Sequence, residues 1–137
     1  MLTMSVKGKY GVAATVELAL HYEKGPLQIK QIAHAQQIPQ NYLELILVEL
    51  KRNGLVTSFR GSRGGYALAK KPNEITLTAI LSCLEGPLQL STDKTSSAVL
   101  KELWETVEET IEETLSITLG TLLLNKQRLE SVTNYSI

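Results

Sequence analysis

The chain is poor in cysteine and aromatic residues, and it lacks any long uncharged apolar run. Cys83 is the single cysteine among 137 residues, which excludes an internal disulfide and any metal or iron–sulfur site that needs two thiolates from one chain. The longest nearly uncharged apolar stretch, residues 115–124, is too short to span a bilayer. Lys7 and Lys9 interrupt the place where a secretory signal carries its apolar segment. We therefore expect a cytoplasmic protein without a membrane anchor.

Groupings of catalytic residues are also missing. The sequence shows no nucleophile with a base and an acid, no phosphate-binding loop and no paired catalytic carboxylates, so we expect no enzyme activity. Cys83 sits among Ile80, Leu81 and Leu84 and is expected to be a small buried hydrophobic residue. The alternative is a redox thiol, but no basic neighbour in the sequence is placed to lower its pKa. No set of metal ligands is predicted.

The net charge is zero, but the two halves of the chain differ in sign. Residues 1–71 carry 10 Lys or Arg and 4 Asp or Glu, whereas residues 72–137 carry 4 basic and 10 acidic residues. The first half therefore has a net charge of +6 and the second half −6. This division suggests that the first half meets a polyanion such as double-stranded DNA, while the second half faces solvent or a partner.

Apolar spacing predicts three helices in the first half, over residues 5–23, 28–36 and 41–52. The third helix has the i, i+3, i+4, i+7 pattern of one buried face, formed by Leu43, Ile46, Leu47 and Leu50. The second and third helices are separated by a tight break that contains Pro39. Two helices joined in this way are the minimum for a helix-turn-helix.

A glycine-rich hairpin is predicted directly after the third helix. Residues 55–59 and 66–69 are two short β-prone runs, and the sequence Arg60-Gly61-Ser62-Arg63-Gly64-Gly65 lies between them. A β-hairpin in this position is the wing of a winged helix-turn-helix.

The second half is expected to be helical. Thr76 is placed to cap a helix that ends near Leu84, residues 88–97 are a linker rich in Ser and Thr, and a long helix covers residues 97–115. The apolar stripe of this long helix consists of Leu100, Leu103, Trp104, Val107, Ile111 and Leu115. We interpret the stripe as a homodimer interface, and the alternative is a helix packed on its own domain.

The predicted fold class is mainly α with a small β-hairpin. A winged helix-turn-helix DNA-binding domain covers residues 1–87, the linker covers residues 88–97, and a helical dimerisation region covers residues 98–137.

Candidate DNA contacts lie at the start of the third helix and in the wing. Recognition helices present their N-terminal residues to base edges, and here these are Gln40, Asn41, Tyr42 and Glu44. A carboxylate such as Glu44 accepts a hydrogen bond from cytosine N4 and is repelled elsewhere, so it would penalise wrong sequences. The wing carries two arginines on a glycine backbone that is thin enough to enter a groove of DNA. The candidate residues are Arg60, Gly61, Arg63 and Gly64. The alternative for the wing is a solvated hairpin without a DNA contact. The alternative for Glu44 is an ordinary exposed helix residue.

Several motifs together resemble those of the Rrf-two family of bacterial winged-helix transcriptional regulators. The most specific is the wing sequence Arg60-Gly61-Ser62-Arg63-Gly64-Gly65-Tyr66-Ala67-Leu68. The resemblance covers nearly the whole chain, and its other carriers are residues 5–11, 41–44, 53–56, 75–76, 84–87, 103–104 and 117–119.

The resemblance implies a homodimer that controls transcription at a partly palindromic operator, and we expect it to act as a repressor. It also implies that Tyr42 and Glu44 read bases or backbone, and that Arg60 and the wing glycines enter the minor groove. The N-terminal segment with Ser5 and Lys9 would contact phosphates.

The expected sensing region departs from the best-known members of the family. Those members carry three cysteines between the fourth helix and the long helix, whereas residues 88–100 contain none here and Cys83 lies before this segment. We therefore expect no iron–sulfur cluster and no other cofactor. The pattern is similar to a cluster-free branch that acts through a partner enzyme, and a small-molecule effector also stays open. The rival interpretation is a winged-helix protein-interaction module that acts mainly through a partner enzyme or sensor.

Overall fold

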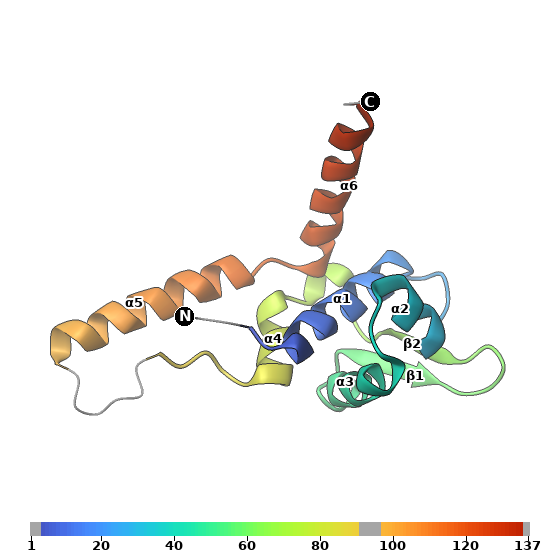
Figure 1. The fold of residues 1–137 in the computed structure, drawn as a ribbon, viewed down its shortest axis with the longest axis horizontal. Helices are drawn as coiled ribbons and strands as arrows, with labels where there is room; N and C mark the ends of the chain where they lie inside the picture. The colour runs from blue at the N-terminus through green and yellow to red at the C-terminus, as the bar shows by residue number, and fades with distance from the viewer. Residues whose placement is uncertain (1–3, 91–96, 136–137) are drawn as a thin grey trace.

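The computed structural model describes residues 4–90 and 97–135 and contains a helical body with two projecting helices (Figure 1). The chain order is helix α1 (Val6–Leu20), helix α2 (Ile29–Gln36), helix α3 (Gln40–Arg52), strand β1 (Val56–Phe59), strand β2 (Gly65–Leu68), a 3-10 turn η1 (Pro72–Glu74), helix α4 (Leu77–Glu85), helix α5 (Ala98–Leu115) and helix α6 (Leu119–Tyr135). The predicted fold class is confirmed: helices dominate and a two-stranded antiparallel sheet follows α3.

Short polar side chains cap α1 and α4, and the cap of α4 at Thr76 is the one that the sequence predicts. The Ser5 hydroxyl accepts a hydrogen bond from the Gly8 amide at the start of α1, and the Thr76 hydroxyl accepts one from the Ala79 amide at the start of α4. Both bonds satisfy amides that have no partner in the first helical turn. Helix α2 ends at Gln37, whose φ of 54° turns the chain into the short connection before α3.

The hairpin pairs β1 with β2 in antiparallel register, with Val56 opposite Leu68 and Phe59 opposite Gly65. The chain before α2 lies along the other edge of β2. There the Leu27 amide donates to the Tyr66 carbonyl at 2.8 Å, and the Tyr66 amide donates to the Leu27 carbonyl at 2.7 Å. The wing is therefore attached to the helical body through an isolated β-bridge as well as through the chain itself.

Close approach of α1 and α4 depends on Gly11. A Cβ atom at this position would lie 2.0 Å from Leu84 Cδ1, a distance at which the two atoms overlap. Glycine in the middle of a helix lowers helix stability by about 0.5–1 kcal/mol relative to alanine. Here it lets two helices of the core pack in direct contact.

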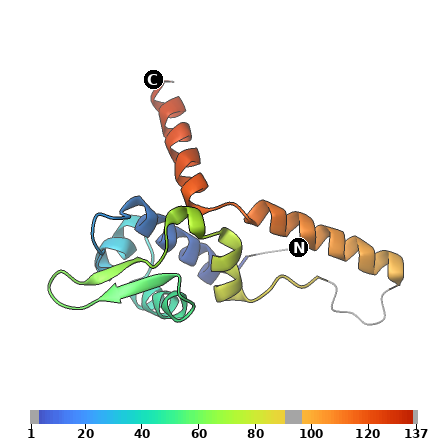
Figure 2. The same ribbon diagram turned by 180° about the vertical axis from the view of Figure 1, so that it is seen from behind.

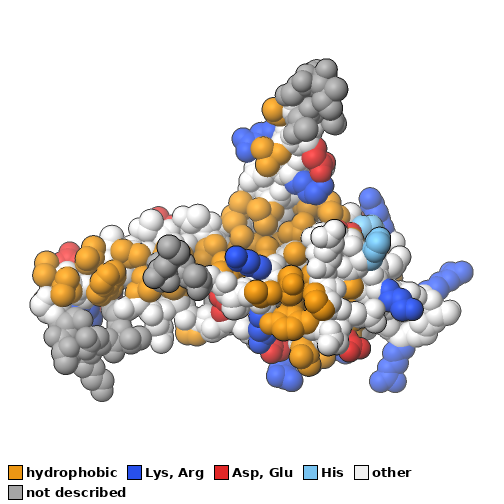
Figure 3. All heavy atoms as spheres, viewed as in Figure 1, with side chains coloured by type: hydrophobic (Ala, Val, Ile, Leu, Met, Phe, Trp, Pro, Cys, Tyr) orange, Lys and Arg blue, Asp and Glu red, His pale blue; other side chains and the backbone are white. Residues whose placement is uncertain are grey.

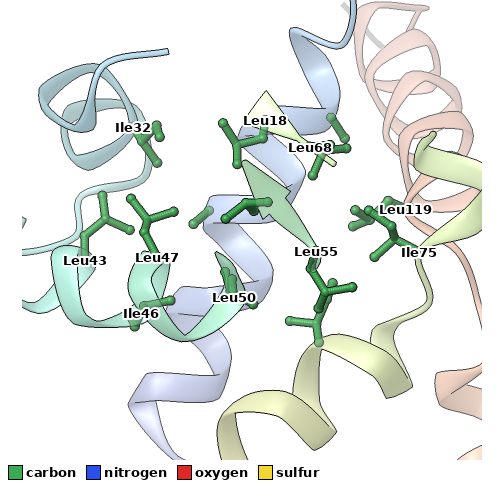
Figure 4. Packing of buried hydrophobic residues seen from close by; sticks show 14 of the residues in the cluster. Leu18, Ile32, Leu43, Ile46, Leu47, Leu50, Leu55, Leu68, Ile75 and Leu119 are labelled. Carbon is green, nitrogen blue, oxygen red and sulfur yellow. The ribbon is translucent and has the colours of Figure 1, made fainter. Parts of the chain in front are cut away.

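The core combines residues from helices α1 to α4 and from both strands, and the start of α6 belongs to it (Figure 4). Leu119 is 0% exposed and lies beside Ile75 (Figure 4). The Leu119 amide donates to the Ile75 carbonyl at 2.9 Å, and the Leu77 amide donates to the Ile117 carbonyl at 3.0 Å. The predicted C-terminal region 98–137 therefore shares the core of residues 1–87 at this point.

Helices α5 and α6 extend away from the body in different directions (Figures 1 and 2). Helix α5 reaches the body at its C-terminal end, and α6 rises from the body after its first turn (Figure 2). The predicted long helix is confirmed, whereas most of the predicted linker, residues 91–96, lies outside the described residues. None of the helices in the described ranges has the length and apolar character that a membrane crossing needs.

Candidate nucleic-acid interface

Helix α3 presents one face to the core and the opposite face to solvent. The four residues of the predicted apolar stripe, Leu43, Ile46, Leu47 and Leu50, are all buried. The outward face has the same i, i+3, i+4, i+7 spacing and is formed by Asn41, Glu44, Leu45, Val48 and, one turn later, Arg52. This exposed face therefore carries an amide, a carboxylate, two apolar side chains and a guanidinium.

Leu45 and Val48 were not among the predicted site residues. Leu45 is 65% exposed and Val48 is 49% exposed, although both are large aliphatic residues on a short, well-packed helix. Apolar side chains on a recognition helix contact the methyl group of thymine in the major groove. The signal that could have identified them is the register of α3, because both lie outside its buried stripe.

Tyr42 and Gln40 stand at the N-terminal end of α3 and are exposed, as predicted. The Tyr42 ring also packs edge-on against Tyr10 of α1, with the ring centroids 5.6 Å apart. This contact limits the directions in which the phenol of Tyr42 can point.

Two polar contacts hold α3 in place. Lys7 Nζ of α1 lies 2.8 Å from Glu49 Oε1 of α3, and both side chains are about one-third exposed. Lys51 Nζ at the end of α3 donates to Ser58 Oγ of β1 at 2.6 Å. These contacts join the helix to the first helix on one side and to the wing on the other.

The tip of the wing exposes Arg60 and Arg63. Basic side chains project from this end of the molecule in Figure 3. Gly61 has a φ of 96°, and the Gly61 carbonyl accepts a hydrogen bond from the Gly64 amide at 2.9 Å. Gly64 is buried, and a Cβ there would lie 2.3 Å from the Phe59 carbonyl oxygen. Gly64 thus allows the tight turn, and the arginines provide the exposed charge.

Ser5 is already engaged within the protein, whereas the Lys9 side chain is exposed. The Ser5 amide donates to Glu85 Oε1 at 2.8 Å, and the Ser5 hydroxyl also donates to this carboxylate oxygen while it caps α1. Glu85 is the last residue of α4. The start of α1 is therefore attached to the end of α4.

Cys83 faces α3 and is partly buried. Its thiol donates to the Glu49 carbonyl at 3.5 Å. Burial raises the pKa of the thiol, the nearby Glu49 charge raises it further, and Lys7 opposes both effects. A raised pKa leaves less thiolate at neutral pH, which disfavours the redox alternative.

Taken together, a helix pair with a tight break, an outward-facing second helix and a basic antiparallel wing define a winged helix-turn-helix protein, a class that binds DNA. Figure 1 shows α3 and the wing next to each other, on the side of the body opposite to α6.

Comparisons with known proteins specify the family. Residues 4–125 match the model of the Rrf2 family, described as an iron-dependent transcriptional regulator. The chain is 41% identical over 106 residues to an HTH-type transcriptional regulator of Synechocystis sp., covering 77% of this chain and 72% of that protein. The solved structure of CymR, the global cysteine regulator of B. subtilis, superposes with a TM-score of 0.83 at 37% identity and covers 89% of this chain and 96% of that one.

The structure of T. potens IscR superposes with a TM-score of 0.80 at 41% identity, over 91% of this chain and 88% of that one. The chain belongs to the Rrf2 family of helix-turn-helix transcriptional regulators. It is a regulator and not an enzyme, as the sequence predicts.

The chain holds fewer cysteines than an iron–sulfur cluster of the usual type requires. Such clusters are held mainly by cysteine thiolates, and this chain has one cysteine. The Cys83 thiol is directed at the Glu49 carbonyl of α3, and burial favours its protonated form. Within residues 4–90 and 97–135, no group of three or more His, Cys, Asp or Glu is arranged to hold a metal ion.

Proposed function

We propose that this protein is a homodimeric repressor that binds a partly palindromic operator, with α3 in the major groove and the wing in the minor groove. The observation that carries the proposal is the exposed face of α3, with Asn41, Glu44, Leu45 and Val48, beside a wing that exposes Arg60 and Arg63. Amide, carboxylate and apolar side chains read base edges, and arginines favour narrow minor grooves. Ser5, Lys9 and the start of α1 would lie against phosphates.

The exposed apolar stripe of α5 supports dimerisation. No α5 residue is buried within the chain, and Leu103 and Trp104 are 48% and 39% exposed. Figure 3 shows hydrophobic side chains along this helix. A helix with one continuous apolar face in water needs a partner surface.

Four of the six stripe residues are spaced symmetrically, which favours a second copy of the chain as that partner. Leu100 and Leu115 are equally far from the midpoint between residues 107 and 108, and so are Trp104 and Ile111. Antiparallel pairing about this midpoint therefore places Leu100 opposite the partner's Leu115 and Trp104 opposite the partner's Ile111. Such two-fold pairing matches a palindromic site on DNA.

Repression and independence from a cluster complete the proposal. A dimer bound across a promoter excludes RNA polymerase simply by occupying the site. The single, partly buried cysteine supports a cytoplasmic protein that works without an iron–sulfur cluster. An operator fragment placed over a promoter should lower transcript yield in a purified system when the iron-free protein is added.

DNA binding is tested by selecting ligands from a random duplex pool and measuring affinity by fluorescence anisotropy. The selected sites should contain two related half-sites, and affinity should fall steeply with salt because phosphate contacts release counterions. Affinity that is absent, or that does not respond to salt, together with a co-purifying protein, would instead support an interaction module.

The dimer is tested by sedimentation equilibrium with a matched pair of variants. Trp104→Glu places a charge in the stripe of α5 and should yield monomers, whereas Leu45→Glu changes an exposed leucine of α3, outside the predicted dimerisation region, and should leave the dimer intact. A Trp104→Glu protein that remains dimeric would refute the α5 interface.

A further inference from the structure

Helix α3 is apolar on two opposite sides. Its inner side is the stripe from Leu43 to Leu50, which is buried in the core. Its outer side carries Leu45 and Val48, which are 65% and 49% exposed and follow one another on the same face because they are three residues apart. An apolar stripe on a helix needs a surface to cover it, and the core covers only the inner one.

Polar groups surround the outer pair. Asn41 lies one turn before Leu45 on the same face, Arg52 lies one turn after Val48, and Glu44 lies beside them; all three are exposed. A stable protein interface covers about 800 Å² on each partner around a continuous apolar centre, which two side chains do not provide. Base edges in the major groove present the matching mixture, with hydrogen-bonding groups and the C5 methyl group of thymine.

The position of α3 in the fold also favours DNA as the partner of this face. In both views α3 lies at the lower edge of the body, apart from α5 and α6 (Figures 1 and 2), so the dimer proposed through α5 does not require the outer pair. The neighbouring wing exposes Arg60 and Arg63. These cations attract the phosphates that border a groove.

The spacing of the outer pair matches the spacing of base pairs. Three residues of an α-helix rise by about 4.5 Å, and stacked base pairs are about 3.4 Å apart. Leu45 and Val48 therefore reach neighbouring base pairs when α3 lies along the major groove. Each base pair offers at most one methyl group, so two apolar contacts require two A·T pairs.

We propose that Leu45 and Val48 determine sequence specificity by packing against the C5 methyl groups of two thymines, on neighbouring base pairs of each half-site. This assignment rests on the proposed function, in which α3 enters the major groove, and it adds the identity of two bases. It differs from the predicted role of Glu44, because a carboxylate penalises wrong bases by charge whereas the apolar pair favours thymine by burying its methyl group.

The test replaces thymine by deoxyuridine, which lacks the methyl group and keeps the hydrogen-bonding groups of thymine. Each thymine of a selected duplex is replaced in turn, and the Kd is measured by fluorescence anisotropy. We expect two neighbouring base pairs in each half-site at which the replacement weakens binding by about fourfold, the effect of exposing one methyl-sized group to water. Unchanged Kd values at every position would overturn the assignment.

Variants identify the side chain that contacts each methyl group. Leu45→Ala should remove the effect of deoxyuridine at one of the two positions and Val48→Ala at the other, whereas Leu45→Met retains an apolar side chain of similar volume and should preserve the effect. Leu124→Ala is the matched control, because Leu124 is 66% exposed on α6, and it should behave like the wild type. Persistence of both effects in both α3 alanine variants would assign the methyl contacts to other residues and refute the proposal.

The selection itself separates this assignment from the proposed function. Salt-dependent binding to selected half-sites that lack two neighbouring A·T pairs would refute the thymine contacts, and the proposed DNA binding would stand. A wild-type protein that binds no duplex from the pool would refute the proposed function and the thymine contacts together.

Discussion

Truncation of Leu119 to alanine should destabilise the whole winged-helix body, although this residue begins a helix that otherwise projects into solvent. Leu119 is 0% exposed and lies in the same cluster as Ile75, Ile80 and the buried face of α3. Its amide is fixed to the Ile75 carbonyl, so the first turn of α6 cannot move far to fill the space left by the missing atoms.

The expected magnitude follows from complete burial. Leu→Ala changes at fully buried sites cost about 2–5 kcal/mol, of which the residual cavity is a substantial part. For a chain of this size, about 1 kcal/mol corresponds to roughly 3 °C in Tm, so Leu119→Ala should melt about 6–15 °C below the wild type. Leu124 lies on the same helix and is 66% exposed, and Leu124→Ala should change the free energy of unfolding by at most about 0.5 kcal/mol.

The assay is thermal unfolding followed by circular dichroism at one fixed protein concentration, because dimerisation makes Tm depend on concentration. Urea unfolding gives the free energy independently. If Leu119→Ala and Leu124→Ala melt at the same temperature, the start of α6 is not part of the core and the reasoning from burial is wrong.

Three further predictions concern the DNA interface and Cys83. Arg60→Ala should weaken binding to a selected duplex by about 1–3 kcal/mol with unchanged Tm; the control Arg128→Ala changes an exposed arginine of α6, and equal affinities in anisotropy would remove the wing from the mechanism. Glu44→Ala should relax the sequence preference in a repeated selection while non-specific affinity stays equal or rises, and uniform loss of binding with an intact preference would contradict this role. Since burial raises the pKa of Cys83, iodoacetamide should alkylate the native protein more slowly than the urea-unfolded protein at pH 8. The raised pKa also makes the stability of the fold depend on pH. Its stabilising contribution is complete below the pKa of the thiol in the unfolded chain, about 8.5, and is lost as the pH rises through the higher pKa of the folded protein. Equal alkylation rates would show that the fold does not perturb the thiol.

Local patterns alone were enough to predict the helix-turn-helix and the wing. The stripe from Leu43 to Leu50, the cap at Thr76 and the glycine-rich turn after Arg60 depend on residues close together in the chain. Such short-range preferences act in the unfolded chain as well as in the folded one. The family motifs and the charge division point to DNA for the same reason, since they are properties of composition and spacing.

Tertiary structure decided what depends on contacts between distant residues. Burial of Leu119 against Ile75 and the attachment of Ser5 to Glu85 join segments separated by dozens of residues. No local preference encodes these distances, because packing of the whole core sets them. The sequence by itself determined which elements form and which faces are apolar. Only the assembled fold decided that Leu119 becomes completely buried at the start of a helix that otherwise projects into solvent, since burial is a property of neighbours that the chain acquires on folding.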